Sequence, residues 1–186
     1  MSHDGPITHD IANRHASPWT LKQRVGLLLW EWAWGLLCVW TPKPLYRWRL
    51  LILRLFGAKI HGTPFVHQRA RIQIPWHLTL HDHCAIGDRT NLYSLGPIEV
   101  GPQATVAQEA YLCTGTHLFD HPNQPLVTAK IVIGANAFIG ARTFILPGIT
   151  VSSNAIVGAC SLVTKNIPAN SIWAGSPARF KRWREA

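Results

Sequence analysis

The sequence predicts an all-β core folded as a left-handed parallel β-helix of six-residue (hexapeptide) repeats. Three observations support this prediction. Aliphatic residues return at every sixth position, small residues follow four positions later, and glycine directly follows several of the aliphatic residues. A helix repeats at about 3.6 residues and an ordinary strand at about 2, so neither produces a lasting period of six. If each unit forms one short strand and one turn, three units close a triangular coil of about eighteen residues.

The chain has 186 residues and a formal net charge of +9, which predicts a partner that carries anionic groups. Phosphates and anionic lipid are the partners that we expect. We expect no nucleic acid, because no helix-turn-helix, RNP or zinc-finger pattern is present and the basic residues lie mainly near the two ends. Apolar residues make up 47% of the chain, which favours a folded core over a disordered chain.

Two segments precede the repeats. Residues 1–18 are polar and contain glycine and proline, so we expect a flexible N-terminus or one draped on the surface. Residues 19–58 are rich in tryptophan and predict a helical hairpin. Thr20 can cap its first helix, and two prolines end that helix. A second helix, about residues 45–56, ends at Gly57, the residue type that most often follows a helix.

The apolar run at residues 25–40 raises the question of a membrane. It is shorter than the roughly 20 apolar residues of a span and is interrupted by Glu31. We expect no signal peptide, since no small-x-small cleavage site follows. Two interpretations remain open. The hairpin packs on the repeats or on neighbouring subunits, or it lies in the bilayer interface, with tryptophan at headgroup depth and arginine on anionic lipid. The second would place a cytoplasmic protein peripherally on the inner face of the membrane.

The repeats occupy residues 59–175. Two slips of two residues shift the register, so the inward aliphatic positions fall into four runs. These runs are Ile60, Val66, Ile72 and Leu78; Leu80, Ile86, Leu92 and Ile98; Val100, Val106, Leu112 and Leu118; and Ile133, Ile139, Ile145, Val151, Val157 and Val163. Small residues such as Ala104, Ala137 and Ala155 follow four positions later, where a crowded corner leaves little room.

The four cysteines are Cys38, Cys84, Cys113 and Cys160, and no C-x-x-C pair occurs. Three of them lie inside repeats beside aliphatic residues, so we predict small reduced side chains that fill the core. Reduced cysteines fit the cytoplasm, and this pattern predicts neither a disulfide scaffold nor a metal site.

The C-terminal repeats carry a family resemblance. Residues 133–151 (IGANAFIGARTFILPGITV) and 157–168 (VGACSLVTKNIP), followed by AGSPA at residues 174–178, resemble hexapeptide-repeat acyltransferases. The sequence looks most like O-acetyltransferases of the colanic-acid-biosynthesis type, which are related to maltose, galactoside and nodulation acetyltransferases. The match covers residues 45–184, and a specific marker is CTGTH at residues 113–117. The resemblance implies a homotrimer with its active site between subunits, acetyl-CoA as co-substrate, and a sugar acceptor from an exopolysaccharide or its precursor.

His117 is the predicted catalytic residue. It stands where the six-residue register breaks, next to an excursion at residues 119–130, and a loop beside a histidine is what a lidded site would look like. A neutral imidazole can take the proton of a sugar hydroxyl as that hydroxyl attacks a thioester carbonyl. The resemblance also places the general base at His117. Asp120 and His121, on the same loop, and Asn91, which matches an acceptor-binding asparagine of the family, are candidates for substrate binding.

The resemblance places acetyl-CoA in a groove between the C-terminal coils of two subunits. By motif match, the groove is lined by Phe138, Ala141, Ala159, Thr164 and Lys165. Residues 176–186 form a basic tail, in which we expect a short helix containing Trp183. Arg179 and Arg182 of this tail suit the phosphates of CoA.

Two alternatives belong to other classes. The first is a γ-carbonic-anhydrase-like zinc enzyme, because His81 and His117 would stack if they lay two coils apart, with His121 close by. The flanking sequence lacks that family's pattern, so we expect no metal. The second is a non-catalytic scaffold held at a membrane by the tryptophan-rich hairpin, for which His117→Ala would leave activity unchanged.

Overall fold

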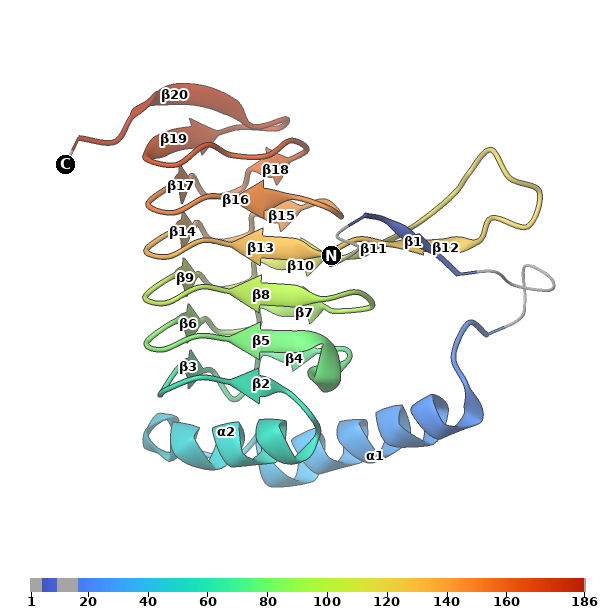
Figure 1. Cartoon of the computed structure of the whole chain (residues 1–186). Helices are drawn as coiled ribbons and strands as arrows, with labels where there is room; N and C mark the ends of the chain where they lie inside the picture. The colour runs from blue at the N-terminus through green and yellow to red at the C-terminus, as the bar shows by residue number, and fades with distance from the viewer. Residues whose placement is uncertain (1–4, 10–16, 186) are drawn as a thin grey trace.

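The computed structural model describes residues 5–9 and 17–185 and shows a parallel β-helix with two helices across one end (Figure 1). The chain crosses three sheets in turn and rises with a left-handed sense. The first sheet contains β2 (Lys59–Ile60), β5 (Leu78–Leu80), β8 (Ile98–Val100), β13 (Ile131–Ile133) and β16 (Thr150–Val151). The second contains β3 (Phe65–Val66), β6 (Ala85–Ile86), β9 (Thr105–Val106), β14 (Phe138–Ile139), β17 (Ile156–Val157), β19 (Ser171–Ala174) and β20 (Arg179–Trp183). The third contains β4 (Arg71–Ile72), β7 (Asn91–Tyr93), β10 (Tyr111–Cys113), β15 (Phe144–Ile145) and β18 (Leu162–Val163).

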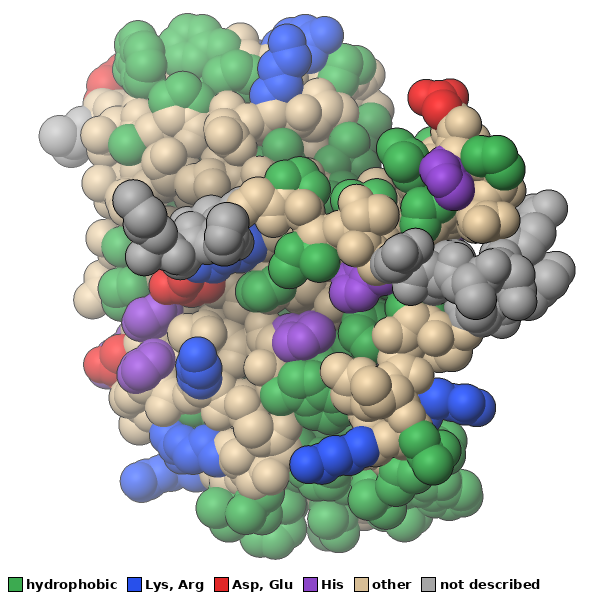
Figure 2. Space-filling model, turned by 45° about the vertical axis from the view of Figure 1, so that its right-hand side comes forward, with side chains coloured by type: hydrophobic (Ala, Val, Ile, Leu, Met, Phe, Trp, Pro, Cys, Tyr) green, Lys and Arg blue, Asp and Glu red, His purple; other side chains and the backbone are tan. Residues whose placement is uncertain are grey.

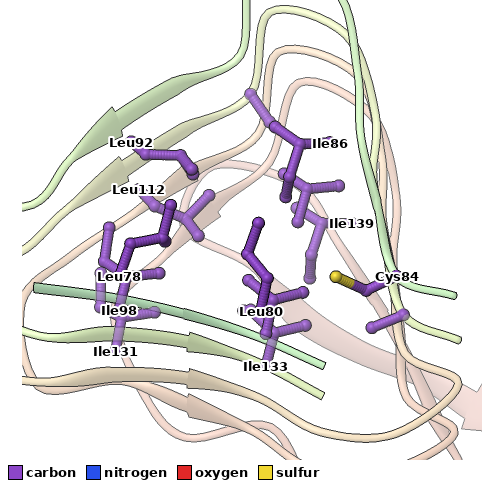
Figure 3. Packing of buried hydrophobic residues seen from close by; sticks show 14 of the residues in the cluster. Leu78, Leu80, Cys84, Ile86, Leu92, Ile98, Leu112, Ile131, Ile133 and Ile139 are labelled. Atoms are coloured by element: carbon purple, nitrogen blue, oxygen red, sulfur yellow. The ribbon is translucent and has the colours of Figure 1, made fainter. Parts of the chain in front are cut away.

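The inward side chains of successive coils stack in columns that fill the triangular interior (Figure 3). On the first sheet, Leu80 pairs with Val100 and Val100 with Ile133, and all three are fully buried. Because each strand is only two to four residues long in most coils, the stability of the fold comes from stacking of many coils rather than from any one strand. The predicted β-helix is confirmed.

The two register slips come from the size of the coils. The lower coils advance by 20 residues, as in the pairing of Tyr111 with Asn91, and the upper coils by the expected 18, as in Phe138 with Ile156. In the first sheet, Leu78 and Leu80 both point inward, and so do Ile98 and Val100, which absorbs the extra residues.

The prediction of an inward side chain is wrong at one position. Leu118 is 45% exposed, because the chain leaves the coil at Thr114, before the expected point. Residues 115–117 and 126–128 then form an antiparallel pair outside the coil, and Ile131 takes the inward place.

The helices close the lower end of the β-helix. Helix α1 (Leu21–Leu37) begins after Thr20, which forms a capping box with Gln23, and a short 3-10 turn leads into α2 (Tyr46–Leu55). The Trp30 indole donates to the carbonyl of Ile72 at 2.7 Å, a carbonyl of the first coil that has no coil below it. Both helices therefore cover an edge that would otherwise expose unpaired backbone groups.

Buried Arg49 ties α2 to the same coil. Its Nε donates to the Val66 carbonyl at 2.8 Å, and its Nη1 donates to Thr41 Oγ1 at 2.8 Å and to the Pro42 carbonyl at 3.0 Å. Thus the helical hairpin of residues 19–58 packs on the repeat domain, which is the first of the two interpretations that the sequence left open. No helix in the described part of the chain is long and apolar enough to span a membrane.

The two ends of the chain differ from expectation. At the N-terminus, β1 (Ile7–Thr8) pairs with residues 127–128, so part of the segment 1–18 is a strand, while residues 1–4 and 10–16 lie outside the described residues. At the C-terminus, the predicted short helix is wrong. Residues 179–183 form β20 instead, antiparallel to β19, because the top coil presents an edge that a strand can cover.

We predict that Gly134→Ala destabilises the protein by about 2–4 kcal/mol, because stacked coils leave no room for the added methyl group. A Cβ at Gly134 would lie 2.5 Å from the backbone nitrogen of Ser153 in the next coil. The measurement is chemical denaturation followed by circular dichroism. The matched control is Gly35→Ala in α1, where no atom lies within 4 Å of the new Cβ. It should raise stability by up to about 1 kcal/mol. Equal stability of the two variants would contradict the account of coil stacking.

Candidate functional site

His117 ends β11 (Gly115–His117), a strand of the arm that projects from the side of the β-helix (Figure 1). The arm consists of β11 and β12 (Leu126–Thr128), with His117 opposite Leu126. The His117 side chain is exposed, and its Nδ1 lies 2.7 Å from the carbonyl oxygen of Gln124. A carbonyl only accepts, so Nδ1 must carry the proton, and in the neutral ring Nε2 keeps a free lone pair. The geometry therefore prepares Nε2 to accept a proton.

The arm is held in place by the N-terminal segment. Strand β1 adds to the outer edge of β12, the His9 amide donates to the Leu126 carbonyl at 2.8 Å, and His9 Nε2 lies 3.0 Å from Thr128 Oγ1. Burial is the largest cause of a lowered pKa of His9, which favours a neutral ring there. Sequence analysis missed this support, because residues about 120 positions apart in the chain carry no local signal of pairing.

The two other candidates on the loop do not contact the His117 ring among the interactions of the described residues. His121 accepts a hydrogen bond from the Asn123 amide at its Nδ1, 3.2 Å away, and its carbonyl accepts from the Gln124 amide at 2.9 Å. It therefore shapes the turn that presents the Gln124 carbonyl. Asp120 is exposed and forms no ion pair with a described residue. The Gln124 carbonyl, rather than Asp120, orients the catalytic candidate.

Asn91 lies on the outer face of the third sheet, in register with Tyr111 on β10, the strand that leads into the arm. Tyr111 stacks on Phe144 of β15, with ring centroids 4.7 Å apart and planes 13° apart. Tyr93 packs on the other side of Tyr111, with a centroid distance of 5.9 Å. Burial raises the pKa of both tyrosines. This half-buried aromatic ladder beside Asn91 was missed, although each ring directly precedes or follows an inward leucine or isoleucine.

The candidate acetyl-CoA residues lie on the upper coils. Ala141 and Ala159 occupy stacked corners between the second and third sheets, joined by a 2.8 Å hydrogen bond from the Cys160 amide to the Ala141 carbonyl. Phe138 is 43% exposed on the second sheet, and Thr164 follows β18 of the third. Small side chains at these corners leave the backbone accessible, as a narrow pantetheine chain requires.

The basic candidates lie near the top of the β-helix. Lys165 is exposed at the corner after β18. Arg179 is the first residue of β20 and Arg182 the last but one, both are exposed, and Arg182 lies 3.5 Å from Glu185. Within one chain these cations stand apart from His117, on different coils. The candidates therefore form two groups, an acceptor group around His117 and Asn91 and a donor group on the upper coils.

A cavity beside the helices contains neither group. It has a volume of about 480 Å³ and lies between α1 and the first coils, where Trp30, Trp34 and Arg71 are among its lining residues. The described residues contain no group of three or more His, Cys, Asp and Glu that could hold a metal ion. His81 instead bonds to Glu99 at 3.0 Å and stacks on His61. Register places Gly101 one coil above His81, 20 residues on, and Gly134 two coils above it, since the second step also contains the arm. His117 lies on that arm, outside the coil, so the stack of His81 with His117 is not formed.

The thiols are not all core fillers. Cys38 and Cys84 are fully buried, and burial raises their pKa values to about 11 and about 12. The prediction of a core filler is wrong for Cys113, which is half-buried on the outer face of β10 because Leu112 takes the inward position. The prediction for Cys160 is wrong, because Ser161 takes the small inward position and Cys160 is exposed at the corner with φ 56°.

Comparison with known proteins identifies the class to which the fold belongs. The family "Bacterial transferase hexapeptide (six repeats)" matches residues 130–165, which form upper coils of the β-helix. Fold and match together define the class of hexapeptide-repeat transferases. A maltose O-acetyltransferase of Clostridium difficile 630 shares the fold, with a TM-score of 0.78, 24% identity and 90% of each chain covered. So does a hexapeptide-repeat acetyltransferase of Vibrio cholerae solved with acetyl-CoA, with a TM-score of 0.80, 20% identity, and 92% of this chain and 94% of that chain covered.

A sequence relative narrows the class. An Escherichia coli K12 protein with the provisional name colanic acid biosynthesis acetyltransferase is 41% identical over 162 residues, which cover 86% of this chain and 88% of the relative. The galactoside O-acetyltransferase of the same organism is 35% identical over 88 residues, 46% of this chain and 43% of that protein. The chain therefore belongs to the hexapeptide-repeat acetyltransferases, which are acyl-transferring enzymes.

We predict that only Cys160 reacts rapidly with a thiol reagent such as DTNB, because thiolate formation and access are both blocked at Cys38 and Cys84. Cys113 should react more slowly, and the two buried thiols only after denaturation. The measurement is the time course of thiol release in the native protein and in guanidinium chloride. Cys160→Ser should remove the fast phase alone. A fast phase that survives this substitution would show that another thiol is accessible.

Proposed function

We propose that this enzyme transfers an acetyl group from acetyl-CoA to a hydroxyl of a sugar, in an exopolysaccharide or its precursor, with His117 as general base. The observation that carries the proposal is the 2.7 Å contact from His117 Nδ1 to the Gln124 carbonyl, with no described residue bonded to Nε2 on this exposed arm. The substrate class follows the names of its relatives, an acetyltransferase of colanic acid biosynthesis and a galactoside O-acetyltransferase.

The proton balance of the reaction is simple. Acetyl-CoA supplies a thioester carbonyl that is open to attack. His117 Nε2 takes the proton of the acceptor hydroxyl as its oxygen forms a bond to the acetyl carbon, the bond from that carbon to sulfur breaks, and CoA leaves. The proton then passes from Nε2 to the departing sulfur, which returns the ring to its neutral form. No side-chain nucleophile is needed, and half-buried Cys113, whose pKa is raised by burial, is a poor candidate for one.

Each half of the site has its own residues. Asn91 binds the acceptor, with Asp120 and His121 at the rim of the loop. The stacked alanine corners at 141 and 159 accept the pantetheine arm beside Phe138 and Thr164. Lys165, Arg179 and Arg182 hold the phosphates.

The active form is a homotrimer, in which the donor group of one subunit meets the acceptor group of its neighbour. Two observations support this arrangement. The two groups lie apart within one chain, and the Tyr93–Tyr111–Phe144 ladder presents a half-buried aromatic face that a neighbour could cover. The proposal also includes a cytoplasmic location and peripheral contact of residues 19–58 with a membrane.

We predict that His117→Ala lowers kcat for acceptor-dependent CoA release by roughly 10²–10⁴-fold, the usual contribution of a general base. The measurement is CoA release from acetyl-CoA with a panel of sugar acceptors, together with CoA binding by calorimetry. The matched control is His83→Ala, an exposed histidine at another corner that pairs with Asp82, and its rate should stay within about twofold. If His117→Ala binds CoA and keeps full activity, the assignment of the base is wrong.

We also predict that acetyl-CoA slows alkylation of Cys160, because the thiol directly follows Ala159 at the proposed donor corner. The measurement is the rate of labelling by a bulky maleimide with and without acetyl-CoA. Free acetate and adenosine should protect less, since neither spans the corner. An unchanged labelling rate at saturating acetyl-CoA would show that acetyl-CoA does not bind at the corner of Ala141 and Ala159.

A further inference from the structure

The outer faces of α1 and α2 form an exposed apolar surface, which we call the helical base. Figure 2 shows hydrophobic side chains gathered over this lower end of the molecule, with Lys and Arg side chains above them. The exposed large hydrophobic residues of the helical base are Leu21, Val25, Leu28, Leu29, Trp32, Leu36, Leu37, Val39, Trp40, Leu45, Trp48, Leu51 and Leu55. A patch of this extent on a folded protein indicates an interaction site.

The helical base is not a loose hairpin that could bury these residues by itself. The inner face of the two helices is already buried. It packs against the first coil through Trp30, Trp34, Leu50 and Leu53. The indoles of Trp30 and Trp34 donate to coil carbonyls at 2.7 and 3.1 Å. Since both helices are fixed from above, their remaining apolar residues face away from the protein as a preformed surface.

The charge around the helical base is strongly basic. Its exposed charged residues are Lys22, Arg24, Lys43, Arg47 and Arg54, against the single acidic residue Glu31. None of these five cations forms an ion pair with any residue that the structure describes. Exposed cations beside tryptophan and leucine match an interface between water and anionic lipid, where each Lys or Arg contributes roughly 1 kcal/mol of attraction.

We infer that the helical base docks flat on an anionic lipid bilayer. The inference deepens the proposed membrane contact by naming the lipid charge and the residues, and it does not depend on acetyl transfer. Docking is interfacial, because α1 has 17 residues, roughly 25 Å at about 1.5 Å per residue, and lies across the coil rather than along its axis. The apolar side chains enter the boundary between headgroups and acyl chains, and tryptophans lie at headgroup depth.

Docking fixes the orientation of the enzyme. Because the helices lie across the end of the β-helix, the coil axis stands along the membrane normal (Figure 1). In the proposed trimer, coils packed side by side would place three helical bases in one plane, so that several weak contacts add up to firm binding. Strand β10, which leads to His117, lies two coils above β4, or roughly 10 Å at about 4.8 Å per strand. With the layer of α1 and α2 below β4, about 10 Å thick, the catalytic arm is held roughly 20 Å above the lipid headgroups.

Vesicle flotation tests the inference. Wild-type protein is mixed with vesicles of phosphatidylcholine alone or of equal parts phosphatidylcholine and phosphatidylglycerol. We expect flotation with the anionic vesicles, weakened when NaCl is raised from about 0.1 M to about 0.5 M. The variant Leu29→Gln/Trp32→Gln/Leu36→Gln changes exposed residues only and should bind the anionic vesicles at least roughly tenfold more weakly.

The matched control is Phe180→Gln/Trp183→Gln, which removes two exposed aromatic residues at the opposite end of the β-helix and should float like wild type. His117→Ala should also float like wild type, so loss of acetyl transfer and loss of docking are separate results. A circular dichroism melt checks that each variant is folded. Absence of wild-type flotation with anionic vesicles, or undiminished flotation of the triple variant, would overturn the inference. So would a triple variant whose only change is a smaller assembly in analytical ultracentrifugation, which would make a second copy the partner of the helical base.

Discussion

The stacking of each coil on the one below is the constraint on which the rest of the structure depends. Aliphatic side chains must meet in columns, and backbone groups must pair from coil to coil, so a long excursion is tolerated only if the coil closes again behind it. Thr114 provides that closure. Its carbonyl accepts from the Ala129 amide at 2.9 Å, while its buried hydroxyl accepts from the Gly96 amide at 2.8 Å and donates to the Tyr93 carbonyl at 2.7 Å. The arm that carries His117 therefore starts from a closed coil, which allows a catalytic side chain to project without weakening the stack.

The same constraint explains the helices and the last strand. A stack of coils has two open ends, and each end presents unpaired backbone groups that would invite aggregation. The top is covered by β20, and the bottom by α1 and α2 through the Trp30, Trp34 and Arg49 side chains. Capping requires only one face of each helix. The apolar character of the opposite face is not needed by the fold, and this is why it points to a partner outside the protein.

The sequence predicted what depends on local periodicity. The β-helix, the inward columns, the cap at Thr20 and the break of register near His117 all follow from spacing or from residue type. Features that depend on pairing between distant segments were not accessible. The addition of β1 to β12 joins Thr8 to Val127, and the preference of residues 179–183 for a strand comes from the exposed edge of β19. The alternative stack of His81 with His117 does not form, because His117 leaves the coil on the arm and Gly134 takes the position two coils above His81. The contact of the His117 ring with a backbone carbonyl also carried no signal, since any residue at position 124 supplies that carbonyl.

The most direct test of the account is a crystal structure of the protein with CoA. The account predicts CoA between two subunits, with its pantetheine arm along the alanine corners at 141 and 159 of one subunit and its sulfur facing His117 Nε2 of the other. Nδ1 should keep its hydrogen bond to the Gln124 carbonyl. A CoA sulfur remote from every His117, or a ring turned so that Nε2 contacts the Gln124 carbonyl and Nδ1 faces the sulfur, would contradict the proposed role of the arm.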